Sequence, residues 1–186
     1  MDKNTLPGLI LHLPVVSHPI VSQLFGANPK IYKTFGLGGH EGIDFACPRD
    51  SVVVAAAPGV VWRSGDSHGP WGIRVILKHD FGFTVYAHLN STMVVPKQTV
   101  RADQIIGFSG ATGNVTGPHL HFCLALPQEN EGYACPVAMG SGLEKFWWHD
   151  PLAVGDALFT TRSVQALGLD LASASHCEPA PPPVEV

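Results

Sequence analysis

The sequence predicts an all-β fold, a small antiparallel β-sheet or sandwich with a groove and little helix. Short runs dense in Val, Ile, Phe and Tyr recur between residues 40 and 126, each bounded by Gly, Pro, Asp or Asn. The same stretch shows no convincing amphipathic helix period. The chain also holds 20 glycines and 16 prolines, which supply many turns. Regularly spaced short strands of this kind favour an antiparallel sheet.

The chain divides into a central domain and two extensions. Residues 1–20 are expected to form an N-terminal arm, 21–160 a single domain, and 161–186 a low-complexity tail. Within the domain, we expect a long loop over 21–40 and an inserted loop over 127–149 whose tryptophans pack back on the core. The expected strands are, in order, GIDFAC, SVVVAAA, GVVWRSG, GIRVILKH, FTVYAHL, QIIGFSG and HLHFCLAL.

The composition excludes several classes of protein. The net charge is −4 and no basic block stands out, so nucleic-acid binding and binding to anionic membranes have little support. No apolar stretch approaches transmembrane length, and the N-terminal apolar run is too short and too interrupted for a signal peptide. The four cysteines form no C-x-x-C pair, so they are expected to be mostly free buried thiols rather than a zinc knuckle.

Two local patterns carry metal-binding chemistry. His40 and Asp44 open one of the expected strands, and residues four apart in an extended strand share a side. His119 and His121 are two apart in a later strand, so they also share a face, and Leu120 points to the core. Imidazole nitrogens and carboxylate oxygens are standard zinc ligands. Cys123 falls on the histidine face, but three residues already complete an open site, so it is not expected to be a ligand.

A third pattern is the Tyr86-Ala87-His88-Leu89 stretch. In the run FTVYAHL, alternation places His88 on the face opposite the apolar residues Phe83, Val85 and Ala87. Each pattern alone is weak, but their order in an all-β setting is specific. The remaining histidines are expected to be structural or exposed: His12, His18, His68, His79, His149 and His176.

Together these stretches resemble the lysostaphin-type zinc metallopeptidases, the LytM-like peptidoglycan endopeptidases of family M23. The resemblance runs from about residue 21 to 155 through GGHEGIDFACP, VVVAAAPGVVWRSG, TVYAHLN and GPHLHF. Two stretches depart from the family pattern: VPKQTVRADQ replaces a Gly-rich hairpin, and the loop over 127–149 is longer. These departures concern the substrate rather than the metal site.

The resemblance implies a role for each motif residue. His40, Asp44 and His121 are the expected Zn²⁺ ligands, and His88 and His119 the expected catalytic histidines. Three protein ligands leave a fourth zinc position open for water, whose pKa the ion lowers toward about 7. We expect His119 to act as general base and proton donor and His88 to support the oxyanion, although the sequence does not separate these two roles.

The resemblance implies hydrolysis of peptide bonds in bacterial peptidoglycan stem peptides or cross-bridges. Three alternatives remain open: a zinc hydrolase that acts on another peptide, a non-catalytic wall-binding or activating domain, and a structural virion component. The enzyme is expected to act at the cell wall. Because no signal peptide is seen, a phage endolysin or virion-associated enzyme is favoured over ordinary secretion, although a mature form without its leader would look the same.

Overall fold

The computed structural model describes residues 9–16, 20–127, 146–153 and 157–158. Its elements are β1 (Ile10–Leu11), β2 (Ile20–Gln23), α1 (Pro29–Tyr32), the 3₁₀ turn η1 (Lys33–Phe35), β3 (Ile43–Ala46), β4 (Val52–Val54), β5 (Gly59–Asp66), β6 (Ile73–Lys78), β7 (Phe83–Thr92), β8 (Thr99–Val100), β9 (Ile105–Ser109), β10 (His119–Leu126), β11 (Trp147–His149) and β12 (Ala157–Leu158).

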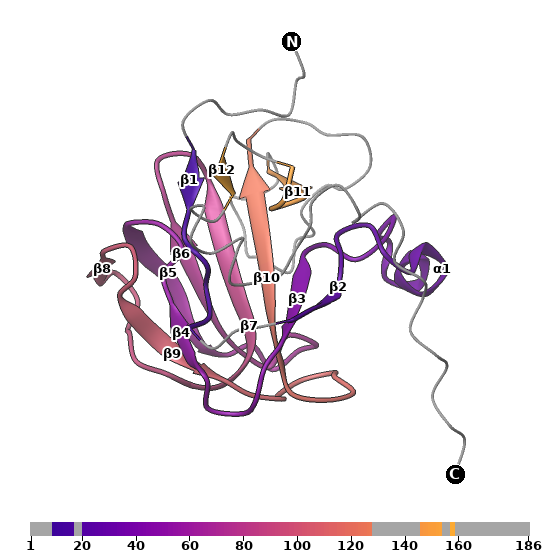
Figure 1. The fold of residues 1–186 in the computed structure, drawn as a ribbon, viewed down its shortest axis with the longest axis horizontal. Coiled ribbons are helices and arrows are strands. Elements are labelled where there is room, and N and C mark those ends of the chain that lie inside the picture. Colours follow the sequence, from indigo (N-terminus) through magenta and orange to yellow (C-terminus); the bar gives the residue numbers. More distant parts are fainter. Residues whose placement is uncertain (1–8, 17–19, 128–145, 154–156, 159–186) are drawn as a thin grey trace.

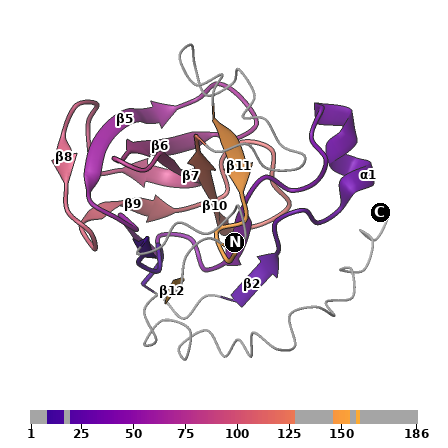
Figure 2. The same cartoon turned by 90° about the horizontal axis from the view of Figure 1, so that it is seen from above.

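Most of the strands belong to one ten-stranded antiparallel sheet, which confirms the predicted fold class. The main path runs β2-β3-β10-β7-β6-β5-β8, with β11 added to β10, and β9 pairing both β4 and β7. Strand β10 lies in the middle of the sheet between β3 and β7 (Figure 1). Seen from above, α1 and β8 lie at opposite ends of the molecule (Figure 2).

The central strands bury both of their faces. Along β10, Leu120 and Phe122 pack into the larger apolar cluster, which also contains Ile43 and Phe45 of β3. Cys123 points the other way, into a smaller cluster built with Val85, Ala87 and Trp148. This alternation follows from the two-residue side-chain period of a strand. The face that carries the smaller cluster also carries His121, because His121 is the cross-strand partner of Ala87.

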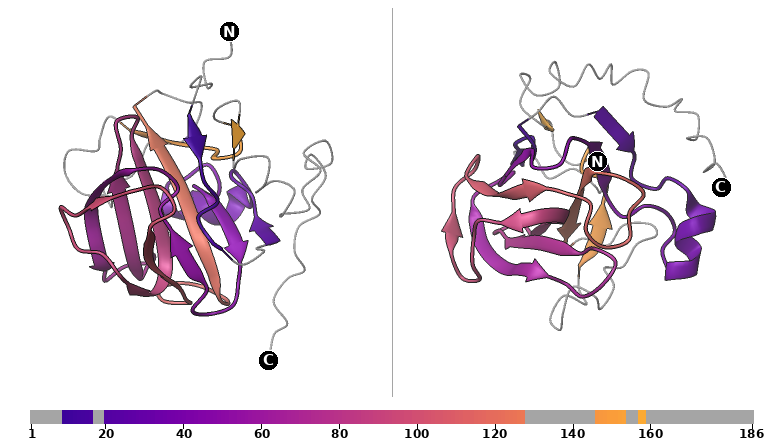
Figure 3. Two further views of the ribbon diagram at one scale, coloured as in Figure 1. Left: turned by 60° about the vertical axis from the view of Figure 1, so that its left-hand side comes forward. Right: turned by 90° about the horizontal axis from the view of Figure 1, so that it is seen from below.

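Every expected strand is present, and the expected loop over 21–40 has more structure than its composition indicated. It contains β2, α1 and η1. Asn28 adopts a left-handed conformation (φ 53°) before Pro29, which occupies the first turn of α1, where a missing N–H group has no consequence. The helix stands beside the edge strand β2, away from β8 (Figure 3). A four-residue helix leaves too short a period to detect in the sequence.

The described part of the N-terminal arm packs against the domain. Leu9, Leu11 and Val15 belong to the larger cluster, and the Val16 N–H donates to the Val52 carbonyl at 3.0 Å. Trp148 is fully buried, as expected for a residue that packs back on the core. Most of the expected inserted loop and all of the tail over 161–186 lie outside the described residues. The three-part division of the chain stays a prediction.

The structure also bears on the predictions about the cysteines and about membrane-spanning helices. Cys47 and Cys123 are buried free thiols, as expected. Among the described helices, none is both long and apolar enough to cross a membrane.

Candidate metal centre and groove

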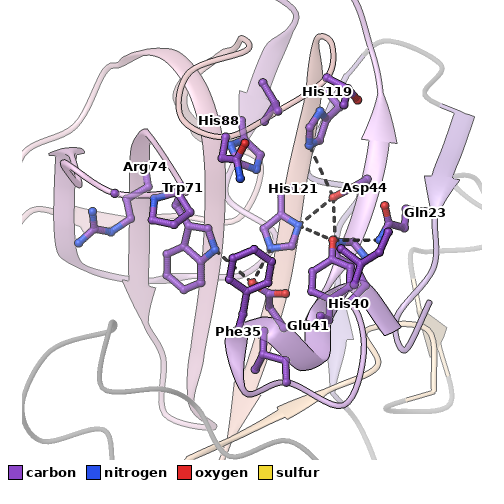
Figure 4. A pocket seen from close by; sticks show the side chains of 18 of the residues that line it. Gln23, Phe35, His40, Glu41, Asp44, Trp71, Arg74, His88, His119 and His121 are labelled. Atoms are coloured by element: carbon purple, nitrogen blue, oxygen red, sulfur yellow. Dashed lines mark hydrogen bonds and ion pairs between the residues drawn. The ribbon is translucent and has the colours of Figure 1, made fainter. Parts of the chain in front are cut away.

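Three of the predicted site residues meet at the centre of the sheet. Asp44 on β3 is the cross-strand partner of His121 on β10, and His40 precedes β3. Asp44 Oδ1 lies 2.8 Å from His121 Nδ1 and 3.2 Å from His40 Nε2, and the two imidazole nitrogens are 3.0 Å apart. One ligand atom from each residue lies within 4.8 Å of the others. Figure 4 shows these side chains pointing toward one another.

His40 reaches this position without being part of a strand, which differs from the sequence expectation. The strand begins at Ile43, and His40 is held by two backbone hydrogen bonds to the β2–α1 connection, with Gly26 and Ala27. Its Nδ1 donates to the Leu24 carbonyl at 3.1 Å, since a carbonyl oxygen can only accept. The bond fixes the tautomer and leaves Nε2 with a free lone pair toward Asp44.

Gly42 makes the close approach of these elements feasible. A Cβ atom at this position would lie 2.4 Å from the Phe122 carbonyl oxygen and 2.8 Å from Cys123 Sγ. Both contacts are shorter than real side chains tolerate, so only glycine lets the segment between His40 and Asp44 lie directly on β10.

The other two predicted histidines flank the cluster. His119 Nε2 lies 3.8 Å from Asp44 Oδ1, and the His88 ring centre lies 4.7 Å from that of His119 and 5.7 Å from that of His121. His88 Nδ1 donates to the Thr112 carbonyl, and His119 Nδ1 to the Gly117 carbonyl, each at 2.9 Å. In their neutral forms, both rings therefore keep an unprotonated Nε2.

The side chain of His88 does not follow the alternation of its strand. Tyr86, two residues earlier, packs in the larger cluster against Phe122, on the side of the sheet away from His121. His88 nevertheless faces the groove, because its backbone is left-handed (φ 60°) at an irregularity where the pairing of β7 with β6 changes register. A left-handed non-glycine residue costs on the order of 1–3 kcal/mol and is typical of functional sites.

All five predicted residues line one groove of roughly 660 Å³. The wall contributed by α1 and η1 includes Ile31, Tyr32 and Phe35, and the opposite wall includes Trp71 and Arg74. This is the groove that the sequence predicted in general terms, with a composition that it did not predict. Tyr32 was missed because it lies in the expected loop; its ring centre is 5.4 Å from that of His40, and its hydroxyl accepts a bond from Gln23.

The sequence model of Peptidase family M23 matches residues 38–132, which include every one of these five side chains. The chain belongs to peptidase family M23.

Two curated relatives are consistent with membership of this family. The chain is 44% identical over 84 residues to the DD-carboxypeptidase/endopeptidase Mpg of Neisseria meningitidis, which is 45% of this chain and 19% of that protein. It is 34% identical over 109 residues to the murein hydrolase activator NlpD of Escherichia coli, 57% of this chain and 28% of that protein. The chain thus spans less than a third of either curated relative.

A solved structure agrees with the fold. The crystal structure of a zinc containing peptidase from Vibrio cholerae superposes with a TM-score of 0.54 and 32% sequence identity, covering 62% of this chain and 36% of that one.

The electrostatics of this M23 domain concentrate charge on Asp44 and His121. Burial alone raises the pKa of Asp44, but the adjacent imidazoles of His121 and His40 outweigh it and hold that pKa well below its usual range. Burial alone lowers the pKa of His121, yet Cys123 and Asp44 together raise it well above the ordinary value. Such a buried carboxylate with two adjacent imidazoles is a donor set suited to zinc.

Three further groups beside the cluster, His88, Tyr32 and Cys123, stay uncharged near neutral pH. Burial, with the nearby His121 and His119, lowers the pKa of His88 to about 3. Burial raises the pKa of Tyr32 to about 12, helped by the Asp44 carboxylate, and raises that of Cys123 to about 11. His88 is therefore a neutral imidazole with an available lone pair, while Tyr32 and Cys123 keep their protons.

Proposed function

We propose that this M23 domain is a zinc-dependent endopeptidase that hydrolyses peptide bonds in bacterial peptidoglycan. The observation that carries the proposal is the convergence of two imidazoles and one carboxylate, with two further histidines beside them, on a single groove. The donor types fit zinc, and the second ring nitrogen of each ligand histidine has its own partner.

In this proposal, His40 Nε2, Asp44 Oδ1 and His121 Nδ1 would hold the zinc ion. When bound, zinc supplies a Lewis acid for the scissile carbonyl and makes water nucleophilic near neutral pH. The Leu24 carbonyl fixes the His40 ring, and Cys123 fixes the ring of His121. The protein thereby holds the ligands in position before substrate arrives.

In this proposal, His119 and His88 accept and return the proton of the attacking water. Each has Nδ1 anchored to a backbone carbonyl, so Nε2 can accept a proton from the attacking water. The same nitrogen then becomes an N–H donor for the leaving amine or for the oxyanion. His119 is the better placed base, because its Nε2 is 3.8 Å from the proposed ligand Asp44. His88 becomes a donor to the developing charge once its Nε2 has taken up that proton.

The peptidoglycan substrate rests on the family and on relatives such as the peptidoglycan DD-endopeptidase ShyA of Vibrio cholerae. The test is digestion of purified sacculi by zinc-loaded protein, with mass spectrometry of the released fragments. New amine termini that disappear with a chelator and in His121→Ala support the proposal. His68→Ala is the matched control, because this histidine side chain is 88% exposed and outside the cluster. Zinc-loaded protein that releases no termini from several wall types would overturn it.

A second candidate follows from the match to NlpD: a domain that binds the wall and activates a separate hydrolase. It predicts sacculus binding and faster release by an added amidase, with no new peptide termini from the domain alone. The five intact groove residues favour catalysis. The same digestion, repeated with and without an amidase, distinguishes the two functions.

A further inference from the structure

Beside the metal cluster, the groove carries a carboxylate and a guanidinium that the proposed chemistry does not use. Glu41 and Arg74 both line the groove, with Trp71 next to them. Glu41 is only 8% exposed. Its Oε1 accepts a hydrogen bond from Trp71 Nε1 at 3.2 Å. Within the described part of the chain, Glu41 Oε2 and Arg74 Nε are buried and have no hydrogen-bond partner.

The hydrogen bond to Trp71 does not explain why a charged Glu41 is buried here. One indole donor satisfies one of the two oxygens, and a glutamine would serve it equally well without a buried charge. A buried acceptor without a partner is unfavourable by about 1–3 kcal/mol, and more when it is charged. The nearest basic nitrogen recorded for Glu41 is His121 Nε2, at 3.9 Å from Oε1, which is too far for a hydrogen bond.

The two groups are separated rather than paired. Among the ion pairs of the described residues, none joins Glu41 to Arg74. In the view of Figure 4, the Trp71 indole lies between them. That indole is fixed from behind by an edge-on contact with Trp148, with ring centres 5.9 Å apart. In this view, the Glu41 carboxylate, the Trp71 indole and the Arg74 guanidinium follow one another along the groove.

We propose that Glu41, Trp71 and Arg74 form a specificity subsite for a substrate residue whose side chain ends in both an ammonium group and a carboxylate. The ammonium pairs with Glu41 Oε2, the carboxylate accepts from Arg74, and the methylene chain lies on the indole. Because Glu41 directly follows the proposed ligand His40, this residue flanks the scissile bond. The inference rests on the proposed function, since it names the peptide that the same groove takes.

Three synthetic stem-type peptides that differ at one residue test the subsite. That residue is diaminopimelate, with ammonium and carboxylate, lysine, with ammonium only, or norleucine, with neither. Dissociation constants for the zinc-loaded protein come from isothermal titration calorimetry, and kcat/KM from mass spectrometry. We expect each added group to strengthen binding by about ten-fold or more, the size of a hydrogen bond to a charged group.

The variants assign each step to its residue. Glu41→Gln keeps an acceptor for Trp71 but loses the charge. In this variant, the dissociation constants of the lysine and norleucine peptides are therefore expected to differ by no more than about two-fold. Arg74→Gln is expected to bind the diaminopimelate and lysine peptides equally well. It should still bind the lysine peptide more tightly than the norleucine peptide. Asp80→Asn, an exposed charge outside the groove, is the matched control and leaves both differences in binding unchanged.

Binding and hydrolysis separate the subsite from the function. Selective binding without hydrolysis supports the subsite and rejects the endopeptidase. Hydrolysis of all three peptides at similar rates, with similar dissociation constants, rejects the subsite and supports the endopeptidase. Unselective or undetectable binding by the wild-type protein, or selectivity that survives in Glu41→Gln, overturns the inference without relying on any variant to be active.

Discussion

The Cys123 thiol lies directly behind the proposed ligand His121, and its removal should weaken zinc binding. His121 Nδ1 faces Asp44, so the other nitrogen, Nε2, carries the ring proton when a metal is bound. That nitrogen lies 2.8 Å from Cys123 Sγ, and Cys123 is fully buried. Because burial raises the thiol pKa to about 11, the sulfur is a neutral acceptor at neutral pH.

The magnitude follows from what replaces the thiol. In Cys123→Ala, Nε2–H loses its acceptor, and Glu41 Oε1, at 3.9 Å, is too far to replace it, so the bound state contains a buried donor without a partner. The metal-free variant avoids this, because losing Cys123 removes a contact that raises the pKa of His121, and the neutral ring can carry its proton on Nδ1 and donate to Asp44. The penalty of about 1–3 kcal/mol therefore falls on the bound state alone and weakens zinc binding by roughly 5- to 150-fold.

Zinc affinity is measured by competition with a chromophoric chelator. Cys123→Ser supplies an oxygen acceptor at the same position and should recover most of the affinity. Cys47→Ala is the matched control: this thiol is also buried, but it lies outside the groove, so the substitution should lower stability and leave zinc affinity unchanged. If Cys123→Ala binds zinc as tightly as the wild type, the thiol does not orient His121 and the reasoning fails.

Three further predictions concern the site and its support. His119→Ala and His88→Ala should retain zinc in a metal-content assay and lower kcat by about 10²- to 10⁴-fold; loss of zinc from either would make it a ligand instead. Gly42→Ala should lower the free energy of unfolding by about 1–3 kcal/mol, measured in urea, because its Cβ would meet the Phe122 carbonyl; Gly117→Ala, which meets nothing within 4 Å, is the control. Burial lowers the pKa of His79, so the unfolded chain takes up a proton first on acidification, and stability should fall as pH drops below about 6.5. In His79→Gln, urea midpoints at about pH 7.5 and about pH 5 should lie closer together than in the wild type; an equal difference would remove His79 as the cause.

The sequence by itself determined the sheet and indicated the residues of the candidate metal centre. Runs rich in β-branched and aromatic residues mark each strand, because such side chains fit a pleated, half-buried surface. The two-residue period then places His119 and His121 on one face of β10, with Leu120 in the core. Short-range geometry is enough for such pairs, since neighbours in one strand share their orientation.

Only the tertiary structure decided how the rest of the site assembles. Strict alternation places His88 on the Tyr86 side of β7, and the left-handed backbone at φ 60° turns it to the groove instead. Glu41 and Arg74 come from distant segments, and no local pattern shows that Glu41 Oε2 and Arg74 Nε lack a hydrogen-bond partner among the described residues of the same groove. Periodicity describes an ideal strand, whereas register shifts and the approach of distant segments depend on how the whole sheet packs.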